Sequence, residues 1–275
     1  MKTRTSLFTL LIGMTLGVTL YGQSQEPPVR VAFSDPNRIG TVKVSLVHGG
    51  VTIKGYNGRE VVIETSSRVN RTSTSDKNAQ GMRRLTNFGA GLTVEEENNI
   101  MSISSSRSSN SVDLTIQVPT RTNLILRAVN NGDIVVEQVQ GDMEINNSNG
   151  RVTLTGVGGS AIVTAHNGRI VASFTQVTAQ KPMSFASYNG TIDVTLPPDV
   201  KANLKMRTDN GDVYSDFDVT LRPNTTTQVE DTRNRGGRYR LRLDRSMQGT
   251  VNGGGPEFEF TSYNGSIYLR KASGR

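Results

Sequence analysis

Apolar and polar residues alternate in short runs along most of the chain, and an Asn-Gly pair separates many of these runs. In MEINNSNGRVTL, for example, Met143 and Ile145 precede the pair, and Val152 and Leu154 follow it. Alternation with a period of two is typical of β-strands that bury one face. Each unit of this kind therefore predicts a strand, a corner and a second strand.

The Asn-Gly corner returns at a nearly constant interval. The corner residues are Asn131, Gly132, Asn149, Gly150, Asn167, Gly168, Asn189, Gly190, Asn210, Gly211, Asn264 and Gly265. Successive glycines lie 18, 18, 22, 21 and 54 residues apart, so an insertion near 216–252 is expected in the last step. Repeats of about twenty residues are typical of β-solenoids, in which each repeat forms one coil. The sequence thus predicts an all-β fold, a single-stranded β-helix with about 18–22 residues per coil.

Stacked coils would bring equivalent residues together. Ile134, Val152 and Ile170 follow three successive corners at the same offset, so they are expected to form a buried column. The corner asparagines are expected to hydrogen-bond in a ladder, because identical amides would repeat at the strand spacing of roughly 4.8 Å. Asn and Gly also tolerate the positive φ angles of tight corners.

A meander of hairpins is the alternative, because Gly141 and Gly159 lie halfway between corner glycines. The apolar positions change parity within a unit, as at Val136 and Val139. A bend inside a coil explains this change and a plain meander does not, so the coil is favoured.

The N-terminal part repeats less regularly. His48 fills the slot ahead of Gly49 that asparagine fills elsewhere. Residues 91–106 predict a hairpin, and the polar residues 66–87 predict a loop or a short helix. The segment SVDLTIQVP predicts an alternating strand with one apolar face, made of Val112, Leu114, Ile116 and Val118.

The first residues have the order of a secretory signal peptide: Lys2 and Arg4, an apolar run from Leu7 to Leu20, and then small and polar residues. We expect a signal peptide over 1–22, a linker over 23–35 and a β-solenoid domain over 36–275. The apolar run is short for a membrane span, so no transmembrane segment is expected in the mature chain. The chain has no cysteine, which suits an exported protein of the bacterial periplasm or cell surface.

The formal charge of +7 is modest and includes Lys2 and Arg4 of the leader. The strongest basic feature is TRNRGGRYRLRLDR, in which Arg238, Arg240 and Arg242 alternate with apolar residues. One interpretation is the solvated outer face of a strand. The other is an anion or glycan contact, because arginine suits bidentate binding of phosphate and carboxylate. Nucleic acid is not expected as a partner, because the sequence offers no aromatic stacking platform.

Candidate chemistry is sparse, and we expect no catalytic residue, no metal and no cofactor. The two histidines, His48 and His166, both fall at corners and are interpreted as turn residues. Asp133 is expected beside Arg151 as a surface ion pair. The acidic pair Asp209 and Asp212 flanks one corner, and a polysaccharide-active enzyme, which needs such carboxylates, stays an alternative.

Several segments together resemble a known family. These are VDLTIQVP, NNGDIVVEQVQGDMEINNSNGRVTLTGVGG, FASYNGTIDVTLPPD, NGDVYSDF and GGGPEFEFTSYNGSIYLRK. They resemble the bacterial "putative-adhesin" β-strand-repeat domain of unknown function, also called the toastrack domain. The resemblance covers roughly Val29 to Lys271. It implies a β-helix in the cell envelope with no established enzyme activity and no agreed ligand.

The sequence therefore predicts a non-enzymatic exported protein of the envelope or cell surface, an adhesin or binding scaffold. Its expected partners are an envelope glycan, lipopolysaccharide or another envelope protein. Some relatives in the resembling family look like parts of envelope-stress systems, so an accessory protein that acts through a partner is a second hypothesis.

Overall fold

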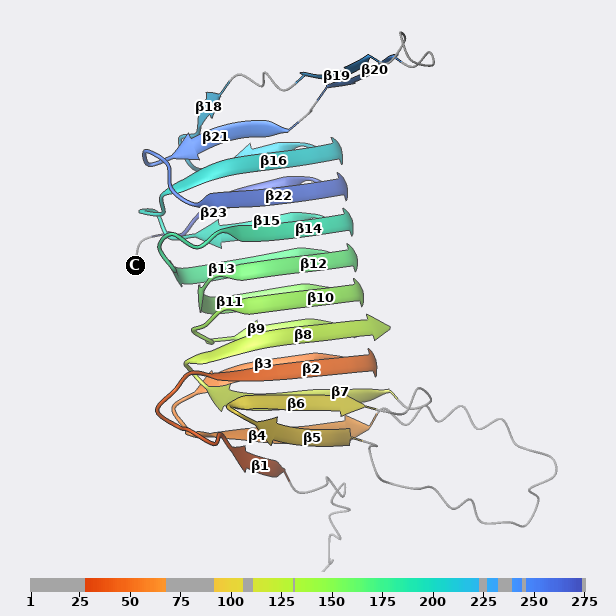
Figure 1. Cartoon of the computed structure of the whole chain (residues 1–275), viewed down its shortest axis with the longest axis vertical. Coiled ribbons are helices and arrows are strands. Elements are labelled where there is room, and N and C mark those ends of the chain that lie inside the picture. The colour runs from red at the N-terminus through yellow and green to blue at the C-terminus, as the bar shows by residue number, and fades with distance from the viewer. Residues whose placement is uncertain are drawn as a thin grey trace, which may run out of the picture.

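The computed structural model describes residues 28–67, 92–105, 111–130, 132–222, 227–231, 239–243 and 246–273. These residues form strands and their connections, and no helix lies among them. The all-β prediction is therefore confirmed over the described part of the chain. Two large sheets carry the fold, and in Figure 1 they lie one behind the other.

Both large sheets are mixed: the neighbours in the middle are parallel, and antiparallel pairs lie at both ends of the eleven-stranded sheet and at the β1 end of the ten-stranded sheet. The ten-stranded sheet contains, in spatial order, β1 (Val29–Ala32), β4 (Glu60–Ser67), β7 (Val112–Pro119), β3 (Val51–Tyr56), β9 (Ile134–Glu137), β11 (Val152–Gly159), β13 (Ile170–Val177), β15 (Ile192–Leu196), β23 (Ile267–Lys271) and β17 (Val213–Ser215). The eleven-stranded sheet contains β18 (Thr220–Arg222), β21 (Met247–Val251), β16 (Ala202–Asn210), β22 (Glu257–Asn264), β14 (Met183–Asn189), β12 (Ala161–Asn167), β10 (Met143–Asn149), β8 (Thr122–Asn130), β2 (Gly40–His48), β6 (Ile100–Ser105) and β5 (Leu92–Glu97). A separate antiparallel pair joins β19 (Thr227–Asp231) and β20 (Tyr239–Leu243).

In the middle of the chain, each corner takes the backbone from the eleven-stranded sheet to the ten-stranded sheet. Val152 on β11 pairs in parallel with Ile134 on β9 and with Ile170 on β13. All three side chains are fully buried, so the expected column is confirmed. The pairing is parallel and one repeat apart, which rules out the meander of hairpins for these strands.

The change of apolar parity has a local cause at Gln138. This residue has a φ of 55°, in the left-handed region, and so bends the chain. Val136 and Val139 lie on either side of the bend, and both side chains are fully buried. Because of this bend, residues of both parities within one coil, Val136 and Val139, point into the core.

The coils do not stack in the order of the sequence at the two ends of the fold. The strands β22 and β23 lie between the β14–β15 coil and the β16–β17 coil. Gly265 therefore stacks on Gly190, and the expected succession from Gly190 to Gly211 is wrong. At the other end, β2 and β3 enter the stack beside β8 and β9.

Aromatic packing explains why β22 fits where it does. Phe185 on β14 and Phe260 on β22 are stacked, with ring centroids 5.4 Å apart. Phe258 and Phe260 are fully buried, and each contributes roughly 1.5–3 kcal/mol by leaving water. The aliphatic side chains of Leu204 and Met206 on β16 cover the far side of these rings through the register of β16 with β22.

Two of the remaining N-terminal predictions are confirmed, and one falls largely outside the described residues. The hairpin is confirmed by the antiparallel pairing of β5 with β6, and the apolar face of β7 is confirmed by its alternating burial. His48 pairs in register with Asn130 at the end of β8. Ser66 and Ser67 belong to β4, so the expected loop or helix is wrong for these two residues, and residues 68–87 lie outside the described residues.

Candidate functional site

The corners of the stack form one continuous surface, which we call the corner edge: residues 149–151, 167–169, 189–191, 264–266 and 210–212. In Figure 1 it lies at the side toward which β10, β12 and β14 point. At each corner a glycine meets the backbone of the glycine one coil away. A Cβ on Gly168 would lie 1.9 Å from the carbonyl oxygen of Gly150, and one on Gly190 would lie 2.2 Å from that of Gly168. Gly168 and Gly190 have no positive φ, so close approach of the coils, rather than backbone conformation, requires glycine there.

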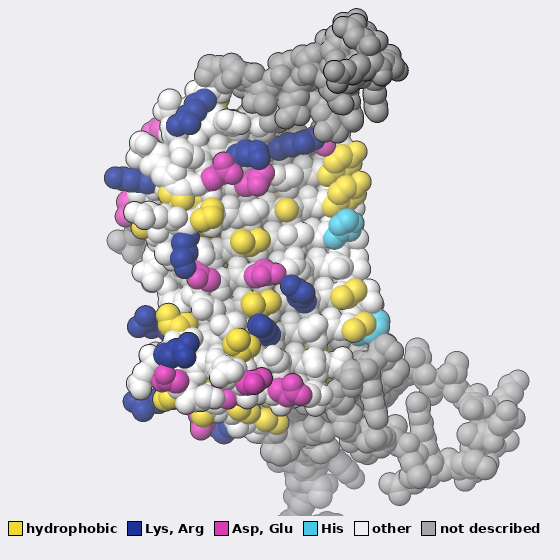
Figure 2. Space-filling view, viewed as in Figure 1, with side chains coloured by type: hydrophobic (Ala, Val, Ile, Leu, Met, Phe, Trp, Pro, Cys, Tyr) yellow, Lys and Arg dark blue, Asp and Glu magenta, His cyan; other side chains and the backbone are white. Residues whose placement is uncertain are grey.

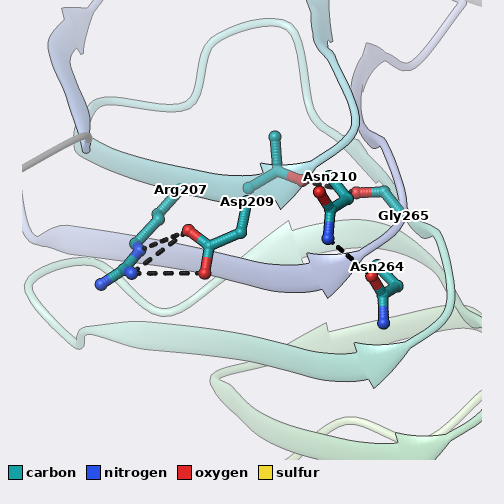
Figure 3. Close-up of polar contacts among 6 residues, drawn as sticks. Arg207, Asp209, Asn210, Asn264 and Gly265 are labelled. Atoms are coloured by element: carbon teal, nitrogen blue, oxygen red, sulfur yellow. Dashed lines mark hydrogen bonds and ion pairs between the residues drawn. The ribbon is translucent and has the colours of Figure 1, made fainter.

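The corner asparagines donate to one another along the edge. Asn167 Nδ2 donates to Asn149 Oδ1 at 2.9 Å, and Asn189 Nδ2 donates to Asn167 Oδ1 at 2.8 Å. Asn264 Nδ2 then donates to Asn189 Oδ1, and Asn210 Nδ2 donates to Asn264 Oδ1, each at 2.8 Å. Figure 3 shows the last step, from Asn210 to Asn264. We call these five side chains the asparagine ladder.

The ladder ends at the coil below Asn149. Asn149 Nδ2 donates to the carbonyl oxygen of Val129 at 3.1 Å. The register pairs Asn147 with Ala128, so Asn130, and not Asn131, is level with Asn149. Asn131 itself lies outside the described residues. The VNNG corner therefore has one residue more than the other corners.

The residue before each ladder asparagine forms a second row on the outer face of the eleven-stranded sheet. In spatial order these residues are Ser148, His166, Tyr188, Tyr263 and Asp209. The rings of His166 and Tyr188 are stacked at 5.1 Å, and those of Tyr188 and Tyr263 at 4.8 Å. The two tyrosines are 46% and 42% exposed. We call these three rings the aromatic row.

Figure 2 shows hydrophobic and histidine side chains following one another along the right-hand edge of this face. Beyond Tyr263, the next residue in this second row is the charged Asp209. Arg207 Nη2 contacts Asp209 Oδ1 at 3.2 Å, beside the ladder in Figure 3. Rings and amides thus lie side by side over several coils.

Below the surface, a row of polar side chains ties each coil to the next glycine. Ser187 donates to the carbonyl oxygen of Gly168 at 3.0 Å, and Ser262 donates to that of Gly190 at 3.1 Å. Asn147 and Thr208 make the equivalent bonds to Gly132 and Gly265. These buried bonds fix the corner backbone and therefore the positions of the rings outside it.

The other side of the ladder carries the residues that follow each corner glycine. Arg151 and Arg169 are exposed and lie on adjacent coils, because Val152 donates to the carbonyl oxygen of Arg169 at 3.0 Å. Asp133 accepts from the backbone N–H of Arg151 at 2.8 Å. The expected ion pair of Asp133 with the Arg151 guanidinium is therefore replaced by a bond to the backbone. Neither guanidinium pairs with a carboxylate among the described residues.

Two hollows lie along the corner edge. One, of about 290 Å³, is lined by Asn146, Asn147, Ser148, Asn149, Thr164, His166 and Asn167. The other, of about 640 Å³, is lined by Asp133, Gly150, Arg151, Asn167, Gly168, Arg169, Asn189, Gly190, Thr191 and Asn264. They share Asn167, so the asparagine ladder separates them. The edge offers amides, aromatic rings and guanidinium groups, which are the groups that bind sugars and acids.

The acidic pair that flanks one corner does not act as a unit. Asp209 accepts from Arg207, whereas Asp212 accepts from the hydroxyl of Tyr214 at 3.4 Å. The negative charge of Asp212 raises the pKa of the Tyr214 hydroxyl. The two carboxylates are thus engaged by different partners.

The arginine stripe is described only in part. Arg240 and Arg242 lie on β20, where their backbones pair with Glu230 and Gln228. Arg238 lies outside the described residues. The stripe therefore stays a prediction.

The sequence pattern does not predict the aromatic row, because it assigns His166 to a turn. The signal was present: His166, Tyr188 and Tyr263 each stand directly before a corner asparagine. His48 has no such neighbour, since it takes the ladder slot itself.

No group of His, Cys, Asp or Glu in the described ranges could hold a metal ion. Over the same part of the chain, the structure contains no helical segment with the length and hydropathy that a membrane crossing requires.

Comparison with known proteins gives one family. A family model described as Toastrack DUF4097 matches residues 37–252. No curated protein matches the chain. Among solved structures, it is similar to a "putative cell adhesion protein" from Clostridium sporogenes, with 13% identity, 90% of this chain and 100% of that chain covered, and a TM-score of 0.39. This chain is also similar to a "putative adhesin" from Bacteroides fragilis, with 13% identity and a TM-score of 0.31. The match covers 90% of this chain and 96% of that chain.

Proposed function

The chain belongs to the Toastrack DUF4097 family, and we propose that this member is a non-enzymatic exported protein of the bacterial envelope or cell surface that serves as an adhesin or binding scaffold. The proposal includes a signal peptide over 1–22, a linker over 23–35 and a binding domain over 36–275. Its partner is an envelope glycan, lipopolysaccharide or another envelope protein.

The corner edge is the observation that carries this proposal. It repeats the same amide from coil to coil, and beside the amides it presents three stacked rings. A surface that repeats at the strand spacing suits a ligand that is itself a repeating polymer. Repeat proteins commonly bind through such extended surfaces.

The chemistry of the edge favours a glycan among these partners. Sugars present hydroxyl groups that amides can bind and apolar C–H faces that can pack on aromatic rings. Arg151 and Arg169 lie across the ladder from the rings, and arginine suits the carboxylates and phosphates of acidic glycans. One polymer lying over the ladder would reach both sides.

A binding screen against envelope polysaccharides and lipopolysaccharide tests the proposal. The variant Tyr188→Ser with Tyr263→Ser removes two exposed rings from the edge. We expect binding about tenfold weaker or worse, which corresponds to a loss of about 1.4 kcal/mol.

The chain offers a matched control. Tyr214 and Tyr268 form a second stacked pair, with centroids 5.1 Å apart, on the ten-stranded sheet. Changing both of these to serine should leave binding unchanged. Equal losses in the two double variants, or no binding by the wild type, would reject the corner edge as the binding surface.

The arginine stripe is tested separately. A variant with Arg238, Arg240 and Arg242 all changed to serine should weaken binding of acidic ligands and lipopolysaccharide if the stripe is a contact. Unchanged binding would give the stripe a purely structural role.

A further inference from the structure

The aromatic row stops at a gap. Tyr188 has a ring on each side of it, namely His166 and Tyr263. His166 has a ring on one side only, because the next residue in the row is Ser148, which has no ring. The residue beyond Ser148 is Val129, whose side chain is 44% exposed. The row therefore leaves space for about one ring between His166 and Val129.

The structure has a hollow at this point. Ser148 and His166 both line the hollow of about 290 Å³ on the outer face of the sheet. A single water needs roughly 10–15 Å³ of such space, so the hollow has room for a group much larger than one water. Adjacent coils lie roughly 4.8 Å apart, so His166 and Val129 are separated by two spacings and one flat group fits between them, at the level of Ser148.

The lining of the hollow is polar and carries no carboxylate, lysine or arginine. Four asparagines and two hydroxyl residues surround the imidazole. The hydroxyl groups of Ser148 and Thr164 have no hydrogen-bond partner among the described residues. A ligand here would meet one ring face and a rim of neutral donors and acceptors.

We infer that this hollow binds one neutral pyranose ring of an envelope polysaccharide, stacked on the free face of His166. The C–H face of the sugar continues the aromatic row where Ser148 interrupts it. Its hydroxyl groups bond to Ser148, Thr164 and the neighbouring amides. An aromatic side chain of a protein partner would also stack on the imidazole, but it would leave the polar rim without partners, which costs binding energy.

The inference rests on the proposed function and adds to it a sugar class and a single subsite. Arg151 and Arg169 lie in the other hollow, across the ladder, and take no part in it. Neutral sugars should therefore depend on the Ser148 gap, whereas acidic sugars should depend on the arginines.

Filling the gap tests the inference directly. Ser148→Tyr would add a ring at the next level of the row and occupy the hollow with the protein's own side chain. Ser148→Ala keeps the gap open and serves as the control. The probes are soluble oligosaccharides of neutral glucans, galactans and mannans, and binding is measured by calorimetry on the full mature chain.

We expect Ser148→Tyr and His166→Ser to weaken neutral-sugar binding at least tenfold, and Ser148→Ala to change it less than about threefold. Thermal melting of each variant shows whether it folds, and Ser148→Tyr should melt no lower than the wild type. If Ser148→Tyr fails to fold, His166→Ser decides the question, because it removes the stacking face without adding volume.

Two results would overturn the inference while leaving the proposed function intact. In the first, Ser148→Tyr binds neutral sugars as the wild type does, although the Tyr188 and Tyr263 double variant has lost binding. In the second, the wild type binds only acidic polysaccharides, or an aromatic peptide that Ser148→Tyr excludes. Failure of the proposed function itself is a different result, in which the wild type binds neither a glycan of any kind nor a protein partner.

Discussion

Substitution of two glycines, Gly168 at a corner and Gly156 within β11, separates two reasons for glycine in this fold. Gly168 lacks a positive φ, but a Cβ there would lie 1.9 Å from the carbonyl oxygen of Gly150. Gly156 is the opposite case, with a φ of 61° and open space where a Cβ would be. We expect Gly168→Ala to fail for lack of space and Gly156→Ala to cost only backbone strain.

The magnitudes follow from these geometries. Real Cβ contacts do not fall below 3.0 Å, so Gly168→Ala must push two coils apart by about an ångström. Overpacking costs about 1–3 kcal/mol, and each strained hydrogen bond beside the corner adds about 0.5–1.5 kcal/mol, which gives roughly 3 kcal/mol. Gly156→Ala places one alanine in the left-handed region, at about 1–2 kcal/mol.

Asparagine at both sites makes the test independent of absolute values. It tolerates the left-handed region better than alanine, so Gly156→Asn should be more stable than Gly156→Ala. At Gly168 the larger side chain has no room, so Gly168→Asn should be no more stable than Gly168→Ala. The readout is urea unfolding followed by circular dichroism, supported by melting, where 1 kcal/mol shifts Tm by about 2–4 °C. A Gly168→Asn variant more stable than Gly168→Ala would refute the close-approach explanation.

Three further predictions concern the ladder, the buried polar row and pH. Asn189→Ala removes two ladder hydrogen bonds and should lower the free energy of unfolding by about 1–2 kcal/mol in urea; an unchanged value would show that the exposed ladder adds nothing. Ala165→Ser completes the buried row with a hydroxyl that can donate to the carbonyl oxygen of Gly150, and the variant should melt higher than the wild type, whereas a lower Tm would mean that the site has no room. Burial acts to raise the pKa of the Asp142 carboxyl, but hydrogen bonds from Lys181 and its other neighbours outweigh burial and lower it below 3.8. Asp142 thus stabilises the fold at neutral pH and loses this effect progressively as pH falls below about 4, so Asp142→Asn should be less stable than the wild type at pH 7 and the difference should shrink on acidification; a difference that does not depend on pH would contradict this.

The local pattern of the sequence was sufficient to predict the strands and corners. Alternation around Met143, Ile145, Val152 and Leu154 places each of them in the core. The pattern could not give the order of the last coils, because every coil presents the same apolar spacing to its neighbours. The position of β22 depends on long-range fit, seen in the stacking of Phe260 on Phe185, and no local spacing encodes that fit.

The sequence predicts the corner asparagines of the candidate site, but it does not predict the exposed row of side chains beside them. The corner asparagines follow from the repeat, but the row beside them differs at every coil, from Ser148 through His166 to Asp209. Its spatial order depends on the inserted coil, which brings Tyr263 next to Tyr188 although 75 residues separate the two along the chain. Aligning the residue before each asparagine finds the members of the row, and only the fold gives their sequence in space.

The placement of β22 and β23 bears on how the molecule is made. The last strands of the chain take an interior position, so β14 and β16 lack a shared neighbour until residues 257–271 have emerged. A ribosome makes these residues after both β14 and β16, and contacts between distant segments form slowly. This part of the stack therefore stays open until β22 and β23 have been made.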